Sequence, residues 1–504
     1  MIAMRLREIA SIGVLCLSTC VVGAATEKRA RLNVVMIIVD DLNDWTGHLK
    51  GHPQTKTPHI DRLAARSISF TNAHASAPLC GPSRTSMWSG LYPHNTGVYG
   101  HIHDGDLHKL KAMKGRQFLP ELFKSQGYKT LGVGKIFHIT DGKKQFDEYG
   151  GIFDRMGPKP PKRINYDPTK FGKGSTQTDW GAYPENSSDM PDHKIAKWSV
   201  GKLQEKHTKP FFMTVGFVRP HVPWHVPAKW FKPFSEKETK LPPLKDDDLT
   251  DLPGMSHTLH SIPGMPPWQW MKKEDRIRAA ATGYLACVHF VDAQVGKVLK
   301  ALEESPYADN TIVILTSDHG YHLGEKHRWA KHSLWERASR VPMLIHTPET
   351  KAAKVKEPVG LIDIYPTLVD LCGLESTDPL NGRSVRPLMS SSIEGEKIPW
   401  RNSVMSIYGK GNISLRSAQY RYIRYVDGSE ELYDMHRDPN EWDNLCYSII
   451  KPELVSVVND FRKQAPKSFQ HWSPYSYANI NPWFDADIKA SRKVTGSKPR
   501  TKYK

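Results

Sequence analysis

Cysteine is scarce in this chain, which has 6 cysteines in 504 residues. Cys16 and Cys20 lie within the first 25 residues, and the others are widely spaced: Cys80, Cys287, Cys372 and Cys446. No Cys-x-x-Cys pair is present, so the sequence indicates neither a cysteine-type zinc site nor a redox pair. So few thiols also exclude a disulfide scaffold. An apolar core must hold the fold, and a hydrophobic fraction of 39% is enough for one.

Long apolar runs are absent. The longest, from Ile9 to Val22, has 14 residues, which is short for a bilayer core of about 30 Å. Basic residues precede it and small residues follow it, so we expect residues 1–24 to be a signal peptide. A lipoprotein site at Cys20 is the poorer alternative because Thr19 precedes it. We expect an exported protein, periplasmic or secreted, without stable membrane insertion.

Acidic residues are also in deficit. Asp and Glu number 53 against 70 Lys and Arg, which gives a formal net charge of +17. A surplus of this size suits an anionic partner such as nucleic acid, a membrane surface or an acidic substrate. No nucleic-acid recognition motif is present, so a nucleic-acid partner is not expected.

Short apolar runs alternate with helical patterns along the first 400 residues. The runs typical of buried strands are Val34–Val39, Thr130–Val133, Phe211–Phe217, Ile312–Thr316 and Pro342–His346. The helical patterns are Pro58–Arg66, Phe118–Gln126, Arg276–Leu302 and Leu361–Leu371. This alternation predicts an α/β fold with a large, mostly parallel central sheet flanked by helices.

The pattern changes near residue 399. Four short strand-like runs separated by turns follow, and Pro452–Gln464 has a helical pattern. We therefore expect a main domain at 25–398, a small antiparallel-sheet subdomain at 399–475 and a basic, disordered tail at 476–504. Two long segments, 142–191 and 219–270, are rich in Pro, Gly and Trp and are expected to be functional loops.

Acidic residues follow two of the predicted strands. Asp40 and Asp41 come directly after the first strand, and Asp318 and His319 follow Thr311–Ser317. Ligands of open α/β sheets bind outside the carboxyl ends of the strands. Clustered carboxylates suit hard cations, and Ca²⁺ fits an exported protein better than Mg²⁺ does.

Cys80 begins the segment Cys80-Gly81-Pro82-Ser83-Arg84, in which Pro82 and Ser83 predict the start of a helix. A helix N-terminus stabilises anions and can activate a nucleophile. Arg84, one turn later, can point at the same anion. A lone cysteine is usually structural, but the neighbouring Pro82, Ser83 and Arg84 favour a reactive one.

At these residues the sequence resembles the type I sulfatases of the alkaline phosphatase superfamily. In that family the cysteine of Cys-x-Pro-Ser-Arg is oxidised by a maturase to formylglycine, whose hydrate is the nucleophile. The resemblance covers roughly residues 31–445 and implies an alkaline-phosphatase-like sandwich in which 25–398 is the catalytic domain. It also implies a metal site formed by Asp40, Asp41, Cys80, Asp318 and His319.

The segment Gly134-Lys135-Ile136-Phe137-His138 matches the family's Gly-Lys-x-x-His. The match implies that Lys135 binds the sulfate and that His138 partners the formylglycine and acts as the base. His94, His101, His103 and His108 could reach the site, but we favour structural roles for them.

Within the family the sequence is most similar to iduronate 2-sulfatases. The segments 215–223 and 323–331 resemble their Gly-Phe-x-x-Pro-His-x-Pro and Leu-Gly-Glu-His-x-x-Trp-x-Lys motifs. This implies a substrate-side role for His221 and Lys331. Because a sugar alkoxide is a poor leaving group, a general acid is needed; we favour His221, with Lys331 as the competitor.

The sequence therefore predicts an exported, Ca²⁺-dependent sulfatase that acts on a sulfated oligo- or polysaccharide. Two alternatives stay open. One is a phosphonate or phosphate monoester hydrolase of the same superfamily. The other is a non-catalytic protein that binds a sulfated polysaccharide.

Overall fold

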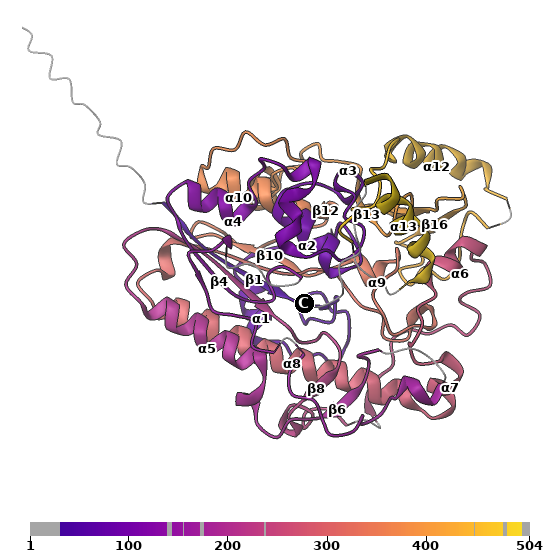
Figure 1. Ribbon diagram of the computed structural model, residues 1–504, viewed down its shortest axis with the longest axis horizontal. Coiled ribbons are helices and arrows are strands. Elements are labelled where there is room, and N and C mark those ends of the chain that lie inside the picture. The colour runs from indigo at the N-terminus through magenta and orange to yellow at the C-terminus, as the bar shows by residue number, and fades with distance from the viewer. Residues whose placement is uncertain are drawn as a thin grey trace, which may run out of the picture. The chain divides into compact units, whose positions relative to one another are not determined.

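A mostly parallel sheet of eight strands crosses the centre of the protein (Figure 1). Its strands are β1 Asn33–Val39, β2 Ile68–Phe70, β4 Lys129–Gly134, β5 Glu148–Tyr149, β7 Phe211–Phe217, β9 Thr311–Ser317, β10 Met343–His346 and β11 Ala353–Val355. They are ordered β11-β2-β10-β9-β1-β7-β4-β5, and only β10 runs antiparallel to its neighbours. The predicted α/β class with a mostly parallel central sheet is confirmed.

The computed structural model describes residues 31–138, 144–154, 156–171, 176–235, 238–447, 449–476 and 481–495. The predicted signal peptide lies outside these ranges. Within them, no helix is both long enough and apolar enough to cross a membrane.

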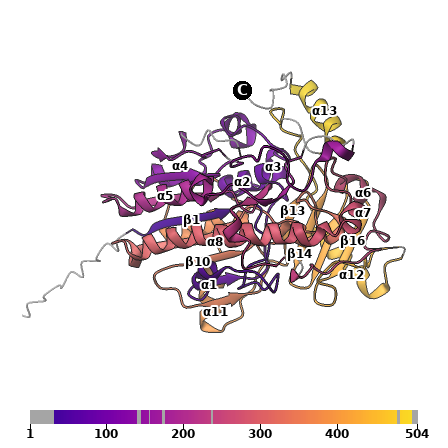
Figure 2. The same ribbon diagram turned by 90° about the horizontal axis from the view of Figure 1, so that it is seen from below.

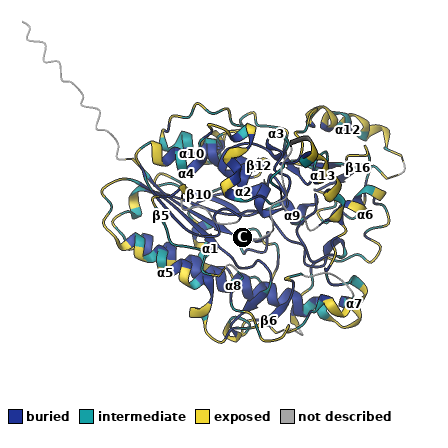
Figure 3. Cartoon of the chain, viewed as in Figure 1, coloured by how far each residue is buried: buried dark blue, intermediate teal, exposed yellow. Residues whose placement is uncertain are grey.

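Helices cover both faces of the sheet, and strand β1 shows why. Its residues are all buried, and because side chains alternate along a strand, they serve two cores. Val35 and Ile37 pack in the core that includes helix α8, whereas Val34 and Met36 pack in the other core. Figure 2 shows the length of α8 beside the sheet, and Figure 3 shows how completely the strands are buried.

On the first face lie α1 Pro58–Ala64, α5 Pro191–Gln204 and α8 Arg276–Glu303. On the second face lie α2 Cys80–Ser89, α4 Leu119–Ser125, α10 Ile364–Cys372 and α11 Arg386–Glu394. The shorter helices are α3 Pro93–Thr96, α6 Gly254–His260, α7 Trp268–Lys273 and α9 Glu336–Ser339. Two small strands, β3 Ala73–His74 and β12 Val359–Gly360, pair beside the main sheet.

The long segments rich in Trp are largely ordered where the structure describes them. Strand β6 Trp180–Ala182 from the first pairs in parallel with β8 Trp224–Val226 from the second. Trp224 is fully buried and meets the ring of Tyr284 edge-on at 5.8 Å. Trp224 therefore fixes the two segments to α8 and is not available to stack on a ligand.

A second, antiparallel sheet follows the main one. Its strands, in order, are β13 Ser403–Ile407, β14 Ile413–Ser417, β15 Tyr420–Arg424 and β16 Glu430–Asp434, and α12 Pro452–Gln464 packs against it. Glu336 of α9 ties this sheet to the main domain, because its carboxylate pairs with Arg416 of β14 at 3.0 Å and also with Arg421 of β15. The predicted antiparallel sheet is confirmed, whereas its boundary at 399 remains a prediction.

The tail differs from expectation. We expected residues 476–504 to be disordered, but Asp485–Thr495 form helix α13, preceded by a short 3-10 turn at Pro482–Phe484. Phe484 and Ile488, one turn apart, are buried, and the ring of Phe484 packs edge-on against Tyr408 at 5.2 Å. The prediction of disorder rested on the many basic residues of the segment and overlooked this apolar pair. Burial of the pair stabilises the helix.

Candidate active site

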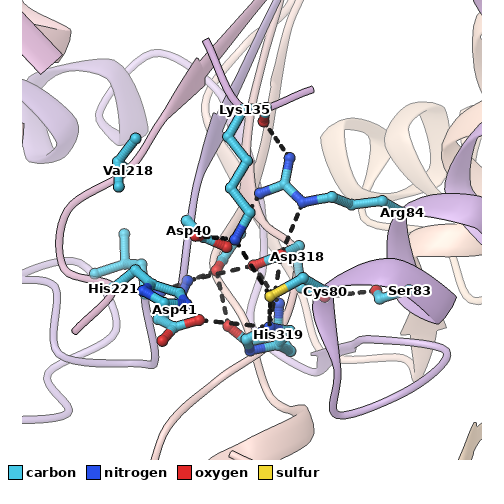
Figure 4. Close-up of polar contacts among 12 residues, drawn as sticks. Asp40, Asp41, Cys80, Ser83, Arg84, Lys135, Val218, His221, Asp318 and His319 are labelled. Atoms are coloured by element: carbon cyan, nitrogen blue, oxygen red, sulfur yellow. Dashed lines mark hydrogen bonds and ion pairs between the residues drawn. The ribbon is translucent and has the colours of Figure 1, made fainter. Parts of the chain in front are cut away.

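The carboxyl ends of four neighbouring strands deliver the predicted site residues to one place (Figure 4). Asp40 and Asp41 follow β1, and Asp318 and His319 follow β9. Lys135 follows β4 directly, whereas His221 lies in the turn after β7. The order β9-β1-β7-β4 makes these ends adjacent, as expected for ligand sites of parallel sheets.

Helix α2 brings the cysteine to the same place. Cys80 is its first residue, after the extended Leu79, and every residue of the helix is buried. The Ser83 hydroxyl donates to the main-chain carbonyl of Asp318 at 2.5 Å, which fixes the start of the helix against the end of β9. Gly81 leaves space for a ring: a Cβ there would lie 2.8 Å from Nδ1 of His101.

Arg84 connects the metal-site carboxylates from behind. Its Nε donates to Asp318 Oδ2 at 2.8 Å, and its Nη2 donates to Asp40 Oδ1 at 3.3 Å. Nη1 donates to the main-chain carbonyls of Lys135 and Ile136. Burial opposes the charge, but Asp318 and Asp40 raise the pKa of Arg84, so the guanidinium stays charged. Arg84 therefore holds the two acids in place and uses four of its five N–H groups within the protein.

Three basic groups converge on the sulfur. Sγ of Cys80 lies 3.3 Å from Nζ of Lys135, 3.1 Å from Nζ of Lys331 and 3.1 Å from Nε2 of His319. Lys135 also pairs with Asp40, and Lys331 pairs with Asp41 at 2.7 Å. The group carried by residue 80 thus sits between two ammonium groups, which suits a reaction that builds negative charge there.

Close packing of two glycines fixes the main chain at Lys135. A Cβ on Gly216 of β7 would lie 2.1 Å from the Lys135 carbonyl oxygen. Gly134, with φ of +80°, is just as close to the Gly216 carbonyl. Only glycine allows the two strands to meet in this way.

The adjacent carboxylates differ in their titration. Burial alone would raise the pKa of Asp40, but Lys135, Arg84 and Lys331 hold it well below its usual range. Burial raises the pKa of Asp41 to about 7; Lys331 opposes this rise and the charge of Asp40 adds to it. Additional positive charge is needed to keep both acids ionised at neutral pH.

The donor set fits a hard cation. Ligand atoms of Asp40, Asp41, Cys80 and His319 all lie within 4.8 Å of one another and are buried. Asp41 Oδ2 has no hydrogen-bond partner among the described residues, although it is buried. Nδ1 of His319 lies 3.0 Å from the Gly320 carbonyl, which suits donation from Nδ1 and leaves Nε2 as the ligand atom. Asp318 lies beside this set, with Oδ2 3.5 Å from Nε2 of His319.

The remaining predicted residues lie around this centre. His221 is buried, with Nδ1 2.7 Å from the Val222 carbonyl. Burial, Lys331 and Lys135 hold its pKa well below the usual range. The ring of His138 stacks on that of His101, with centroids 3.6 Å apart. His101, for which we favoured a structural role, therefore lies between His138 and the Gly81 backbone; it was hard to select because nothing in its spacing marks it.

Comparison with known proteins agrees with this architecture. Residues 32–374 match the sulfatase family, and residues 324–468 match the C-terminal family of N-sulphoglucosamine sulphohydrolase. A sulfatase of Formosa agariphila is 39% identical over 93% of this chain and 94% of its own. The iduronate 2-sulfatase of Mus musculus is 29% identical over 72% of each chain. A solved 2-O GAG sulfatase superposes with a TM-score of 0.66 at 23% identity, over 92% of this chain and 94% of its own.

The fold and the site define a hydrolase with the alkaline-phosphatase-like architecture and a buried cysteine at a helix N-terminus. The chain belongs to the sulfatase family, and it is a sulfuric ester hydrolase.

Proposed function

We propose that this sulfatase is exported and removes sulfate esters from a sulfated glycan, as an iduronate 2-sulfatase-like enzyme. The nucleophile is a formylglycine that a maturase makes from Cys80. The observation that carries this proposal is the convergence of Lys135, Lys331 and His319 on the Cys80 sulfur.

The electrostatics of Cys80 support its conversion. Burial raises the pKa of its thiol, and Lys135 and Lys331 offset only part of this rise. The unmodified thiol is therefore a poor nucleophile at neutral pH. A hydrated aldehyde at the same position offers two hydroxyl groups, one to attack sulfur and one whose deprotonation allows sulfate to leave.

Asp40, Asp41, His319 and residue 80, with Asp318 beside them, would hold the metal ion, and the carboxylate oxygens favour Ca²⁺. When bound, Ca²⁺ would supply positive charge that stabilises the negative charge developing in the reaction. Its charge would also favour the ionised form of Asp41, whose pKa burial raises to about 7.

The chain's own cations hold the sulfate. Lys135 and Lys331 flank residue 80 and bind the sulfate oxygens on which charge develops. His138 accepts the proton from the second hydroxyl, and its ring is oriented by the stacked His101. Arg84 donates four of its five N–H groups to the carboxylates of Asp318 and Asp40 and to two carbonyls, and the remaining N–H of Nη2 can meet a sulfate oxygen.

His221 protonates the leaving sugar oxygen. In the free site its ring is neutral, because burial and the two lysines depress its pKa. A bound sulfate brings negative charge against Lys331 and Lys135 and therefore raises that pKa toward the range of a general acid. Lys331 is the competing acid, but the carboxylate of Asp41 and the other charges nearby raise its pKa far above neutrality against the effect of burial.

The glycan preference rests on relatives. The mouse relative that aligns over 72% of this chain is named an iduronate 2-sulfatase, and a structural neighbour is named a 2-O GAG sulfatase. Export rests on the predicted signal peptide at residues 1–24.

The test is a substrate panel with the modification verified. The protein is produced together with a formylglycine-generating maturase, and mass spectrometry of the peptide containing residue 80 confirms the aldehyde. Sulfate release is then measured from uronate 2-sulfate, galactose sulfate and hexosamine sulfate disaccharides, with an aryl phosphonate as the comparison. We expect uronate 2-sulfates to be the best substrates. If no sugar sulfate is hydrolysed although the aldehyde is present, the glycan proposal is refuted.

A further inference from the structure

A cavity of about 260 Å³ lies between α6, the start of α7 and the segment that leads to Lys331. Its walls include the rings of Trp268 and Trp335. Trp268 stacks on the ring of His327 with centroids 4.1 Å apart and planes inclined by 13°. The half-buried ring of Trp268 suits the apolar face of a sugar ring, whereas Trp335 is buried and closes the cavity from behind.

The cavity is basic. Among the described residues that line it, five carry a basic nitrogen and none is acidic: His257, His260, Lys326, His327 and Arg328. Burial holds the pKa of His260 well below its usual range and lowers that of His327, so these two rings are neutral at neutral pH. The permanent charges in the wall are therefore those of Lys326 and Arg328.

Lys326 already has its counter-charge. Its ammonium lies 2.6 Å from Oδ1 of Asp248 and also donates to the Glu441 carbonyl. Asp248 and Lys326 are both buried, so the pair is neutral as a unit. Lys326 therefore offers no unmatched charge to a ligand.

Arg328 has none. It is 7% exposed, and its Nη2 donates to the main-chain carbonyls of Lys331 and His332, each at 3.2 Å. Its Nε has no hydrogen-bond partner, and no carboxylate pairs with it, within the part of the chain that the structure describes. Burial lowers the pKa of Arg328 to about 10. A buried cation without a counter-ion is costly unless an anion joins it.

We propose that this cavity is a second anion subsite, in which Arg328 binds a singly charged group of the sugar unit next to the one that loses its sulfate. The single unmatched charge sets the ligand charge, and the guanidinium suits the paired oxygens of a carboxylate or a sulfate ester. This inference rests on the glycan substrate proposed above and specifies its neighbouring unit as anionic.

Arg328 lies close enough to the reacting position for one substrate to contact both. Arg328 is three positions before Lys331, so their Cα atoms lie within about 11 Å of each other even in an extended chain. Lys331 in turn contacts Cys80. The cavity therefore lies beside the segment that carries Lys331, and we expect one or two sugar units to span the distance to the reacting sulfate.

The competing role for Arg328 is structural, because it also clamps the carbonyls beside Lys331. The test separates the two roles with Arg328→Gln, Arg328→Lys and the control Arg386→Gln, an exposed arginine of α11. Substrates are an aryl sulfate and tetrasaccharides whose terminal unit carries the sulfate to be released. Their neighbouring unit keeps its carboxylate and sulfate, lacks the sulfate, or has the carboxylate reduced.

The subsite predicts a KM about tenfold higher for Arg328→Gln on the fully charged tetrasaccharide, with a much smaller effect on the aryl sulfate. Removing the responsible anion should raise the KM of the unmodified protein similarly and leave Arg328→Gln insensitive to it. Arg328→Lys should recover part of the affinity, and Arg386→Gln should behave as the unmodified protein. An equal loss on the aryl sulfate and on every tetrasaccharide, or no loss at all, overturns the subsite.

Calorimetry keeps this result separate from the glycan proposal. The Cys80→Ala protein, with and without Arg328→Gln, is titrated with the charged tetrasaccharide. Weaker binding only when Arg328 is replaced supports the subsite even if no glycan is desulfated, an outcome that would refute the proposed function alone. Equal binding by both proteins refutes the subsite.

Discussion

The ammonium of Lys331 lies 3.1 Å from the sulfur of Cys80 and 2.7 Å from Oδ1 of Asp41. One side chain therefore joins the metal-site carboxylates to the nucleophile position, although Lys331 is 251 residues from Cys80 in the chain. Removing its charge should affect the transition state more than substrate binding, because negative charge grows on the sulfate during attack.

Lys331→Gln should lower kcat by about 10²–10³-fold, the usual effect of removing one preorganised donor. Steady-state kinetics on an aryl sulfate measures this. Lys354→Gln, an exposed lysine on the edge strand β11, is the matched control and should leave kcat unchanged. An unchanged kcat in Lys331→Gln would contradict the assigned role.

The two candidate acids can be told apart by their leaving groups. If His221 is the acid, His221→Gln should lower kcat on a sugar sulfate by about 10²–10⁴-fold and much less on nitrophenyl sulfate, whose phenolate leaves without a proton. Loss of Lys331 should affect both substrates. Equal losses on both substrates in His221→Gln would remove it as the acid.

Removal of the cation should inactivate and destabilise the protein. Without it, two buried and adjacent carboxylates repel each other, and the pKa of Asp41 rises to about 7. We expect a chelator to abolish turnover and lower the Tm, and added Ca²⁺ to restore both in a concentration-dependent way. The Asp41→Asn variant should show little Tm response to Ca²⁺; a response as large as that of the unmodified protein would exclude Asp41 as a ligand.

Stability should fall as the pH rises from about 4 to 7 because of Asp292 in α8. Burial raises its pKa to about 7, although it accepts hydrogen bonds from the main chain of Ile60 and His59. In this window the folded state keeps a proton that the unfolded state has released, so each pH unit costs up to about 1.4 kcal/mol of unfolding free energy. Asp292→Asn should remove this part of the slope in urea unfolding, whereas exposed Asp309→Asn should not. Equal slopes in both variants would show that Asp292 titrates normally.

Helix α13 should contribute to stability. Phe484 is fully buried against Tyr408 and Trp472. Phe484→Ala should therefore lower the unfolding free energy by about 3–5 kcal/mol, as in other aromatic truncations in cores. Trp483→Ala, the half-buried neighbour, should cost less. A loss below that of Trp483→Ala would mean that the segment is not docked in solution.

Local patterns predicted the elements that carry the site. The expected strand Phe211–Phe217 and helix Pro452–Gln464 have the observed bounds, and the strand that ends before Asp40 differs by one residue. These elements have strong apolar periodicity that needs no knowledge of the rest of the fold. The Cys80 motif and the acids after β1 and β9 could be located in the same way.

The features that sequence reasoning missed depend on partners distant in the chain. The pairing of Glu336 with Arg416 and Arg421 joins residues about 80 positions apart, and neither end has a local signal. Helix α13 was missed because its charge was more visible than the spacing of Phe484 and Ile488. The unmatched charge of Arg328 could be recognised only after Lys326, two residues away, was seen to have its own acid.

The contact between Gly134 and Gly216 limits how this enzyme can be altered. Since even an alanine at either position would strike a main-chain carbonyl, a library that randomises the surroundings of Lys135 should keep both glycines. Selection for new substrates should then succeed most often at positions that do not set the sulfate pocket, such as Arg328 and Trp268. Such variants would keep the same sulfate-ester hydrolysis and differ in the polymer that they accept.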